Sequence, residues 1–180
     1  MKKLLLSIII VLMAAGCVRI PPGIEPVDGF EVERYLGTWY EIARLDHSFE
    51  RGLHEVSATY TLRDDGGIKV VNRGYNPEKG EWKEAVGKAY LVDDPGTGRL
   101  KVSFWGPFYG AYTIIALDKK DYSHAMVCGP TRSYLWILAR TPYMPEPLKA
   151  ELVKKADNLG FETGELIFVT HTLAEQKKKP

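Results

Sequence analysis

The residues of this chain best suited to chemistry are two cysteines, four histidines and one charged pair within an apolar run. The histidines have neither the helical spacing of a metal-binding pair nor a recurring carboxylate neighbour; they are His47, His54, His124 and His171. We therefore expect them to be scattered over the surface, and we expect no metal site. Glu41 and Arg44 are charged near an expected cavity, where a structural salt bridge is favoured over contact with a ligand head group.

Cys128 keeps an enzymatic interpretation open, because a thiol inside a cavity can act as a nucleophile. A buried free cysteine that behaves as a small apolar side chain is far more common. The chain has no Gly-x-Ser-x-Gly sequence, no phosphate-binding loop and no dinucleotide fingerprint. The sequence therefore predicts a protein that is not an enzyme and needs no cofactor. The alternative is a lipid-modifying enzyme that uses Cys128 or a histidine.

The amino terminus has the pattern of an export signal that ends in a cysteine. Residues 1–3 are basic, residues 4–13 are apolar, and the small residues 14–16 precede Cys17 directly. This pattern resembles the bacterial lipobox, which implies cleavage after Gly16 and attachment of S-diacylglycerol and an N-acyl (palmitoyl) chain to Cys17. The alternative is an ordinary signal peptide with a chance cysteine. No aspartate follows Cys17, so the resemblance favours the outer membrane, with the protein facing the periplasm.

Length and charge restrict the remaining classes. A chain of 180 residues fits one domain with a substantial core. A net charge of +1 does not supply the basic surface that nucleic acid requires, so we expect no nucleic-acid partner. We divide the chain into a signal peptide (1–16), a lipidated and Pro/Gly-rich tether (17–29), a folded domain (30–171) and a Lys-rich tail (172–180).

Turn signals recur at short intervals between runs rich in Val, Ile, Thr, Tyr and Trp, which predicts strands over 38–46, 54–63, 67–75, 81–93, 99–105, 109–118, 122–129 and 133–140. Short connections make sequential strands antiparallel neighbours, and eight of them can close into an up-and-down β-barrel. A flat sandwich is the alternative. A helix is expected over 147–159, packed outside the barrel, followed by a short ninth strand over 166–169. Alternation leaves the inward face of the fourth and sixth strands open.

Three short motifs fall at one end of such a barrel. Gly37 and Trp39 open the first strand, Asp118 and Tyr122 flank the turn between strands six and seven, and Arg140 ends the eighth. These motifs, in this order, resemble those of the lipocalin family, most closely its bacterial outer-membrane lipoproteins, and the sequence is also similar to apolipoprotein D. The resemblance implies that Arg140 stacks across Trp39 and closes this end, which makes the motif residues structural rather than catalytic.

The resemblance also implies a hydrophobic ligand, a fatty acid or a lysophospholipid, held in the barrel for lipid storage, transport or envelope maintenance under stress. A structural envelope lipoprotein whose barrel is filled by its own side chains is the further alternative. The ligand is expected to enter beside the segment 46–53 at the opposite end. The candidate cavity residues are Val56, Ala58, Tyr60, Phe104, Tyr112, Tyr134 and Trp136. A homodimer is compatible with the sequence.

Overall fold

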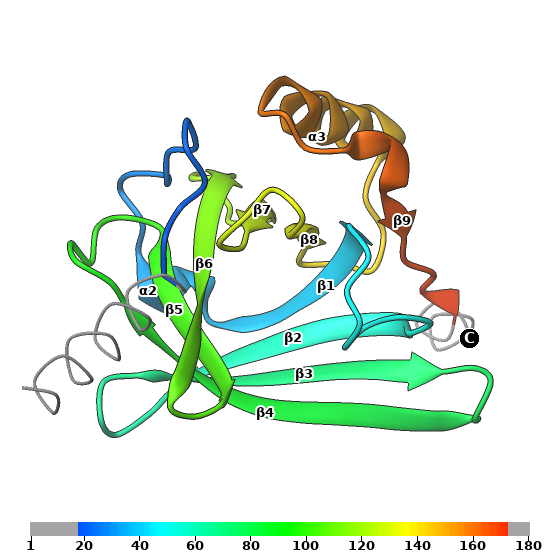
Figure 1. Cartoon of the computed structure of the whole chain (residues 1–180), viewed down its shortest axis with the longest axis horizontal. Helices are drawn as coiled ribbons and strands as arrows, with labels where there is room; N and C mark the ends of the chain where they lie inside the picture. The colour runs from blue at the N-terminus through cyan, green and yellow to red at the C-terminus, as the bar shows by residue number, and fades with distance from the viewer. Residues whose placement is uncertain (1–17, 173–180) are drawn as a thin grey trace, which may run out of the picture.

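The computed structural model describes residues 18–172, which form a closed antiparallel β-barrel with one long helix outside it (Figure 1). The predicted signal peptide, Cys17 and the Lys-rich tail after Thr172 lie outside the described residues. The eight barrel strands are β1 (Gly37–Arg44), β2 (His54–Leu62), β3 (Ile68–Asn76), β4 (Glu81–Leu91), β5 (Arg99–Trp105), β6 (Phe108–Leu117), β7 (His124–Cys128) and β8 (Leu135–Ala139).

Each strand pairs with the next, and β1 closes the circle by pairing with both β2 and β8. The prediction of an eight-stranded up-and-down barrel is confirmed, and the predicted strand ends agree with the observed ones to within two residues. A β-bulge between Glu41 and Ala43 interrupts the pairing of β1 with β8. A ninth strand, β9 (Ile167–Phe168), lies antiparallel to the end of β1.

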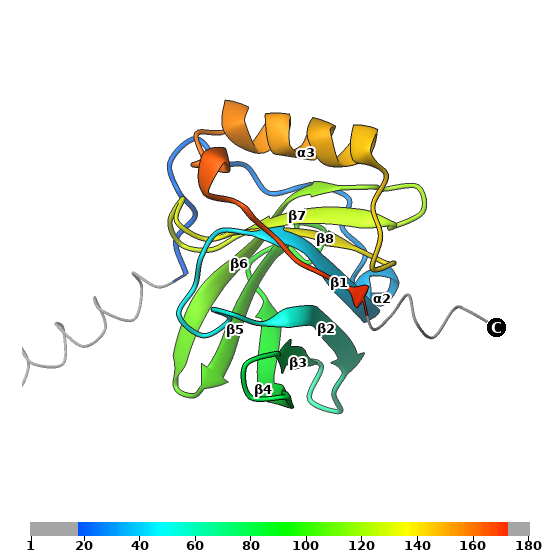
Figure 2. The same ribbon diagram turned by 90° about the vertical axis from the view of Figure 1, so that its right-hand side faces the viewer.

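The apolar side chains form two separate clusters on the two faces of the sheet. The interior cluster includes Trp39, Tyr60, Val70, Ile114 and Val127, which face one another inside the barrel. The second cluster lies between the outer face of the wall and helix α3 (Glu146–Asn158), which crosses above β7 and β8 (Figure 2). Leu152 and Ala156 are the buried residues that α3 adds to this second cluster. The short helix η1 (Thr163–Glu165) follows α3.

The segment before the barrel packs against the wall, although the sequence predicted an extended tether over 17–29. Its described part lies along the barrel wall, where Val27 N donates to Ile114 O at 2.9 Å and Gly98 N donates to Val27 O at 2.8 Å. Ile24 is buried in the cluster beneath α3. The Pro and Gly residues of this segment predicted an extended linker. Its apolar side chains instead gain free energy by packing against the wall. Helix α2 (Val32–Tyr35) then leads into β1.

Strand registers settle the faces that alternation left open. Trp39 lies opposite Ala58, Ala58 opposite Asn72, and Asn72 opposite Ala85. Residues opposite one another in a sheet share a face, so Ala85 points into the barrel together with Trp39. In β6, Ile114 belongs to the interior cluster, whereas Ile115 and Ala116 belong to the cluster beneath α3. Within residues 18–172, no helix is both long and apolar enough to span a membrane.

Candidate functional site: the barrel interior and its two ends

The closed end of the barrel is built around Trp39, which is completely buried. The Arg140 guanidinium carbon lies 3.9 Å from the centre of the indole ring, in cation–π geometry. The indole Nε1 donates to Tyr35 O at 2.8 Å, so its polar atom is satisfied. Gly37 has φ +95°, and a Cβ at this position would lie 3.3 Å from Arg140 Nη1. The structure therefore places Gly37, Trp39 and Arg140 in direct contact.

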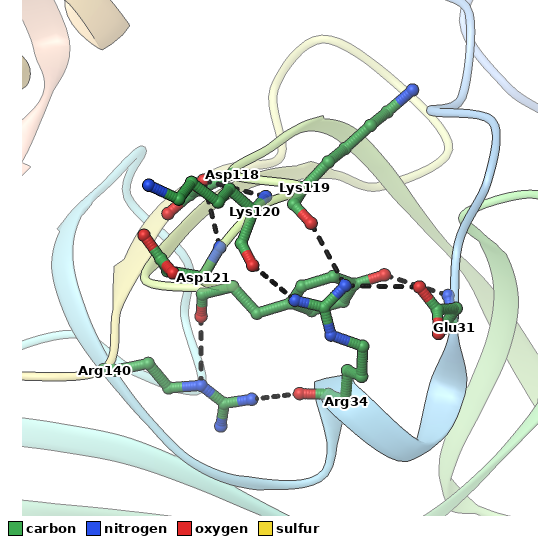
Figure 3. A network of polar contacts seen from close by, with 8 residues as sticks. Glu31, Arg34, Asp118, Lys119, Lys120, Asp121 and Arg140 are labelled. Carbon is green, nitrogen blue, oxygen red and sulfur yellow. Dashed lines mark hydrogen bonds and ion pairs between the residues drawn. The ribbon is translucent and has the colours of Figure 1, made fainter.

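A network of polar contacts links this end to the turn between β6 and β7 (Figure 3). Arg140 donates to Arg34 O at 2.6 Å and to Tyr122 O at 3.2 Å. The Asp118 carboxylate accepts from the backbone N–H groups of Lys120 and Ser123, and the Ser123 hydroxyl lowers the pKa of Asp118. All three predicted motifs thus meet at one end, in contacts that hold backbone carbonyls and a turn. This geometry suits a structural role.

Three tyrosines form a hydroxyl chain in the middle of the barrel. Tyr112 Oη lies 2.8 Å from Tyr35 Oη and 2.8 Å from Tyr60 Oη. Burial raises the pKa of Tyr35, Tyr60 and Tyr112, so all three hydroxyls stay protonated at neutral pH. The predicted cavity residues Tyr60 and Tyr112 therefore present mutually hydrogen-bonded hydroxyls, as well as apolar rings, to the barrel interior.

Two carboxylates and one guanidinium are buried beyond this tyrosine chain. Arg44 Nη1 donates to Glu41 Oε1 at 2.6 Å, and Arg44 Nη2 donates to Glu50 O at 2.8 Å. The Glu50 carboxylate accepts from Trp136 Nε1 at 3.0 Å. Burial raises the pKa of Glu41 to about 8, and the nearby Glu50 carboxylate adds to this while Arg44 opposes it. Burial also raises the pKa of Glu50, so both carboxylates bind a proton more readily than exposed glutamates do.

The segment 46–53 covers the other end of the barrel and is fixed by buried contacts. The His47 ring stacks on Tyr134 with a centroid distance of 4.8 Å and on Phe49 at 5.4 Å. Burial lowers the pKa of His47 to about 4, which leaves the imidazole neutral. Leu53 is buried inside, and its Cδ1 lies 3.0 Å from the point where a Cβ on Gly74 would be.

The prediction of scattered surface histidines is wrong for two of the four. His47 and His171 are 4% and 8% exposed, whereas His54 is exposed and His124 is half-buried. His47 is buried because aromatic rings surround it. His171 is buried because the chain after β9 lies against β1, where His171 Nε2 is 2.7 Å from Glu41 O. Among residues 18–172, no group of three metal-ligating side chains is found.

The other predicted cavity residues have different surroundings. Ala58, Phe104 and Trp136 pack against the interior cluster and are half-buried. Val56 is buried, and its Cγ2 lies 3.3 Å from the point where a Cβ on Gly74 would be. Tyr134 lies in the turn between β7 and β8 and stacks on His47 at the covered end. The set therefore extends from the centre of the barrel to its rim.

Cys128 does not line the barrel interior, so the structure contradicts the alternative of a cavity thiol and agrees with the favoured interpretation of a buried free cysteine. It is fully buried in the cluster beneath α3, on the outer face of β7. Burial raises the pKa of the thiol to about 12, which disfavours the nucleophilic thiolate. The register explains the placement, because Val127 faces inward and its neighbour must face outward.

Two hollows of about 670 and 210 Å³ are found on the outer surface of the described chain. The larger lies between residues 18–22 and the β4–β5 turn, and the smaller lies between β1, β9 and the start of α3. None of the predicted cavity residues lines either hollow.

Sequence reasoning missed Glu50 and Tyr35, which complete the interior polar groups. Glu50 lies in a polar loop, where carboxylates are normally solvated, and nothing local indicates that this one turns inward. The separation of Tyr35 from Trp39 was a usable signal, because two aromatic residues four apart flank the Gly37 turn. Their rings stack with a centroid distance of 4.7 Å.

Comparison with known proteins gives close relatives. The chain is 58% identical over 149 residues to outer membrane lipoprotein Blc of Citrobacter freundii, covering 83% of this chain and 84% of the relative. It is 56% identical over 149 residues to outer membrane lipoprotein Blc of Escherichia coli K12, with the same coverage. It is 35% identical over 124 residues to apolipoprotein D of Rattus norvegicus, covering 66% of this chain and 65% of the relative.

Solved structures show the same fold at low sequence identity. Insecticyanin from the tobacco hornworm Manduca sexta has a TM-score of 0.67 and 17% identity, covering 87% of this chain and 89% of that chain. The cockroach allergen Per a 4 also has a TM-score of 0.67, with 18% identity, covering 88% and 98%. The profile of the Lipocalin-like domain matches residues 30–171. With the motif contacts at the closed end and these relatives, the chain belongs to the lipocalin family.

Proposed function

We propose that this protein is a lipid-anchored lipocalin of the outer membrane that binds a fatty acid or a lysophospholipid inside its barrel. The relatives at 56–58% identity are named outer membrane lipoproteins, which supports anchoring through Cys17. The lipocalin fold supports a hydrophobic ligand. The ligand class and the role in storage, transport or envelope maintenance are the proposed part.

Inward-facing side chains that are not buried carry this proposal. By register, Ala58, Asn72 and Ala85 point into the barrel, yet Ala58 and Asn72 are half-buried and Ala85 is exposed. A barrel filled by its own side chains would bury such residues. Phe104 and Trp136 are half-buried as well, so apolar surface lies next to this open space.

Burial of an acyl chain supplies enough free energy for useful affinity. A sixteen-carbon chain gains roughly 12 kcal/mol at about 0.8 kcal/mol per CH₂. Association and ordering cost roughly 4–15 kcal/mol, so affinity near micromolar needs no buried charge pair. Arg44 agrees with this, because its Nη1 and Nη2 already bind Glu41 and the Glu50 carbonyl, although its buried Nε has no hydrogen-bond partner among the described residues. The ligand head group is therefore expected to stay away from Arg44.

The direct test is native mass spectrometry with lipid extraction on the soluble form that begins after Cys17, purified from bacteria. We expect a fatty acid or lysolipid to co-purify at near one-to-one. The same spectra report whether the protein is a monomer or a homodimer. An empty protein that also ignores added palmitate and lysophospholipid would support a structural envelope lipoprotein instead.

A variant tests the position of the acyl chain. Ala58→Trp places an indole in the inner space and should weaken palmitate binding by roughly tenfold or more, since it displaces several methylene groups. Thr61→Trp, on the outer face of the same strand, is the matched control, because Thr61 is exposed. Fluorescence titration gives both affinities, and equal binding by two folded variants would contradict the placement.

A further inference from the structure

One side of the barrel wall is paired over only part of its length. On one side β4 pairs with β3 from Glu81 to Ala89 without a break. On the other side it pairs with β5 only from Lys88 to Leu91. Within the described chain, the edge of β4 from Glu81 to Gly87 therefore has no neighbouring strand. Figure 1 shows β4 continuing toward the right while β5 and β6 turn downward.

The two strands separate where a phenylalanine rests on a glycine. A Cβ on Gly87 would lie 2.8 Å from the Phe104 ring and 2.8 Å from Ser103 O. Phe104 thus lies at the point where the pairing of β4 with β5 ends, and the unpaired part of β4 begins next to it. Ser103 Oγ is buried at this point without a hydrogen-bond partner in the described structure.

The unpaired edge exposes the inner face of the barrel as well as the outer one. All six residues from 81 to 86 are exposed. Ala85, Lys83 and Glu81 face inward by register, opposite Asn72, Gly74 and Asn76. Exposed inward-facing side chains mean that solvent reaches the barrel interior through this side.

The charges on this edge do not favour an added β-strand. Lys83 points inward, and inward-pointing charges are a common protection of strand edges against pairing. The apolar surroundings favour a hydrocarbon instead, because Val86, Trp105 and Phe108 are 54%, 84% and 76% exposed around the gap. Lys83 makes no salt bridge with any described residue, not even with Glu81 on the same face, so its ammonium is available to an anion.

The covered end offers a more obstructed route. Arg44 binds the carbonyl of Glu50, and the Glu50 carboxylate binds Trp136. Leu53 fills the space over Gly74. A ligand that passed under the segment 46–53 would have to break these buried contacts, whereas among the described residues no hydrogen bond crosses the unpaired side of β4 from Glu81 to Val86.

We propose that the acyl ligand enters and leaves between the β4 edge (81–87) and the β5–β6 hairpin (103–108), with its anionic head group at Lys83. The head group is a carboxylate or a phosphate, since both match a single ammonium. This inference rests on the proposed lipid binding and adds the route and the head-group contact.

Stopped-flow fluorescence with a fluorescent fatty acid tests the route. Ala85→Trp narrows the gap from the inner face of β4. Glu84→Trp, at the preceding residue, places the same side chain on the outer face. We expect Ala85→Trp to lower the association rate by about tenfold. Ala58→Trp, which shares the inner face but lies on β2 away from the gap, should raise the dissociation rate and leave the association rate unchanged. Glu84→Trp should leave both rates unchanged. Unchanged rates in a folded Ala85→Trp variant that still binds would overturn the route.

Charge variants test the head-group contact and distinguish its two sources. Lys83→Glu should weaken palmitate or 1-palmitoyl lysophosphatidate by roughly tenfold and leave neutral monopalmitoylglycerol unchanged. An effect on palmitate alone assigns a carboxylate, and an effect on lysophosphatidate alone assigns a phosphate. Lys69→Glu, an exposed lysine on the outer face of β3, is the control. Equal losses for all three lipids would overturn the contact, whereas a wild-type protein that binds none of them would refute the proposed function itself.

Discussion

Arg140 joins several segments of the chain at the closed end. Its guanidinium covers Trp39 and donates to three backbone carbonyls, those of Arg34, Thr38 and Tyr122. These carbonyls come from α2, β1 and the β6–β7 turn, so one side chain connects three segments that are distant in sequence. Hydrogen bonds from a charged donor contribute more than neutral ones, particularly where water is partly excluded.

We expect Arg140→Met to lower the free energy of unfolding by about 3 kcal/mol, because it leaves carbonyls unpaired and removes the cation–π contact. Urea unfolding followed by far-UV circular dichroism measures the change. Arg63→Met is the control, since Arg63 pairs with Asp65 at the exposed surface and should cost under about 1 kcal/mol. Similar losses in both variants would contradict the role of Arg140.

The buried Glu41 should make stability depend on pH. Burial raises its pKa to about 8, so the folded protein keeps a proton that the unfolded chain loses near pH 4.5. The free energy of unfolding should therefore fall as pH rises toward 8, by up to about 1.4 kcal/mol per pH unit. His47 acts in the opposite direction between pH 4 and 6.5, because its pKa is lowered. The decline should be clearest between pH 6.5 and 8.

Urea unfolding across that window, on wild type and Glu41→Gln, checks this prediction. The glutamine cannot titrate, so the slope should disappear in the variant. A slope that persists unchanged in Glu41→Gln would assign the pH dependence to another group.

At the scale of elements, helix α3 protects the outer face of β7. Leu152 and Ala156 of α3 share a buried cluster with Cys128. We expect Leu152→Ala to destabilise the protein by about 2–4 kcal/mol and to speed the reaction of Cys128 with a disulfide reagent, because local opening of α3 exposes the thiol. The soluble form after Cys17 contains only this cysteine. Lys154→Ala, on the exposed side of α3, should change neither quantity.

The elements were predictable because their patterns are local. Turn residues separate β-branched and aromatic runs, and the apolar stripe of α3 has helical spacing, so the barrel and its helix follow from the sequence. The β-bulge after Glu41 was not predictable, and it decides that Arg44 points inward beside Trp136. The short pairing of β4 with β5 was equally hidden, because it depends on where Phe104 packs against Gly87.

The candidate site was less predictable than the fold for the same reason. The motif residues at the closed end were identified by their resemblance to the lipocalin motifs, and counting strands placed all three motifs at the same end of the barrel. Burial of His47 and Glu50 depends on how one loop folds back over the barrel, and that loop has no periodic pattern. The face of Cys128 was uncertain because both faces of β7 are apolar.

At the scale of the whole molecule, the two ends of the barrel differ, and the tryptophans report on this difference. Trp39 is fully buried at the closed end, whereas Trp136 is half-buried near the segment 46–53. In variants that keep one tryptophan each, bound palmitate should reduce acrylamide quenching of Trp136 and leave Trp39 unaffected. Equal protection of both, or of neither, would contradict binding in the half of the barrel away from Trp39.

The last described segment, residues 167–172, completes the wall of the barrel. β1 pairs with β2 only from Gly37 to Tyr40, and its remaining length pairs with β9. Beyond β9, Glu55 N donates to Thr170 O, which joins the segment to β2. The wall between β1 and β2 therefore includes residues from both ends of the folded domain.

Such long sequence separations raise the relative contact order, which slows folding. A nascent chain cannot complete this wall before residues 167–172 have been synthesised. Premature termination before β9 would leave the second half of β1 as an open edge.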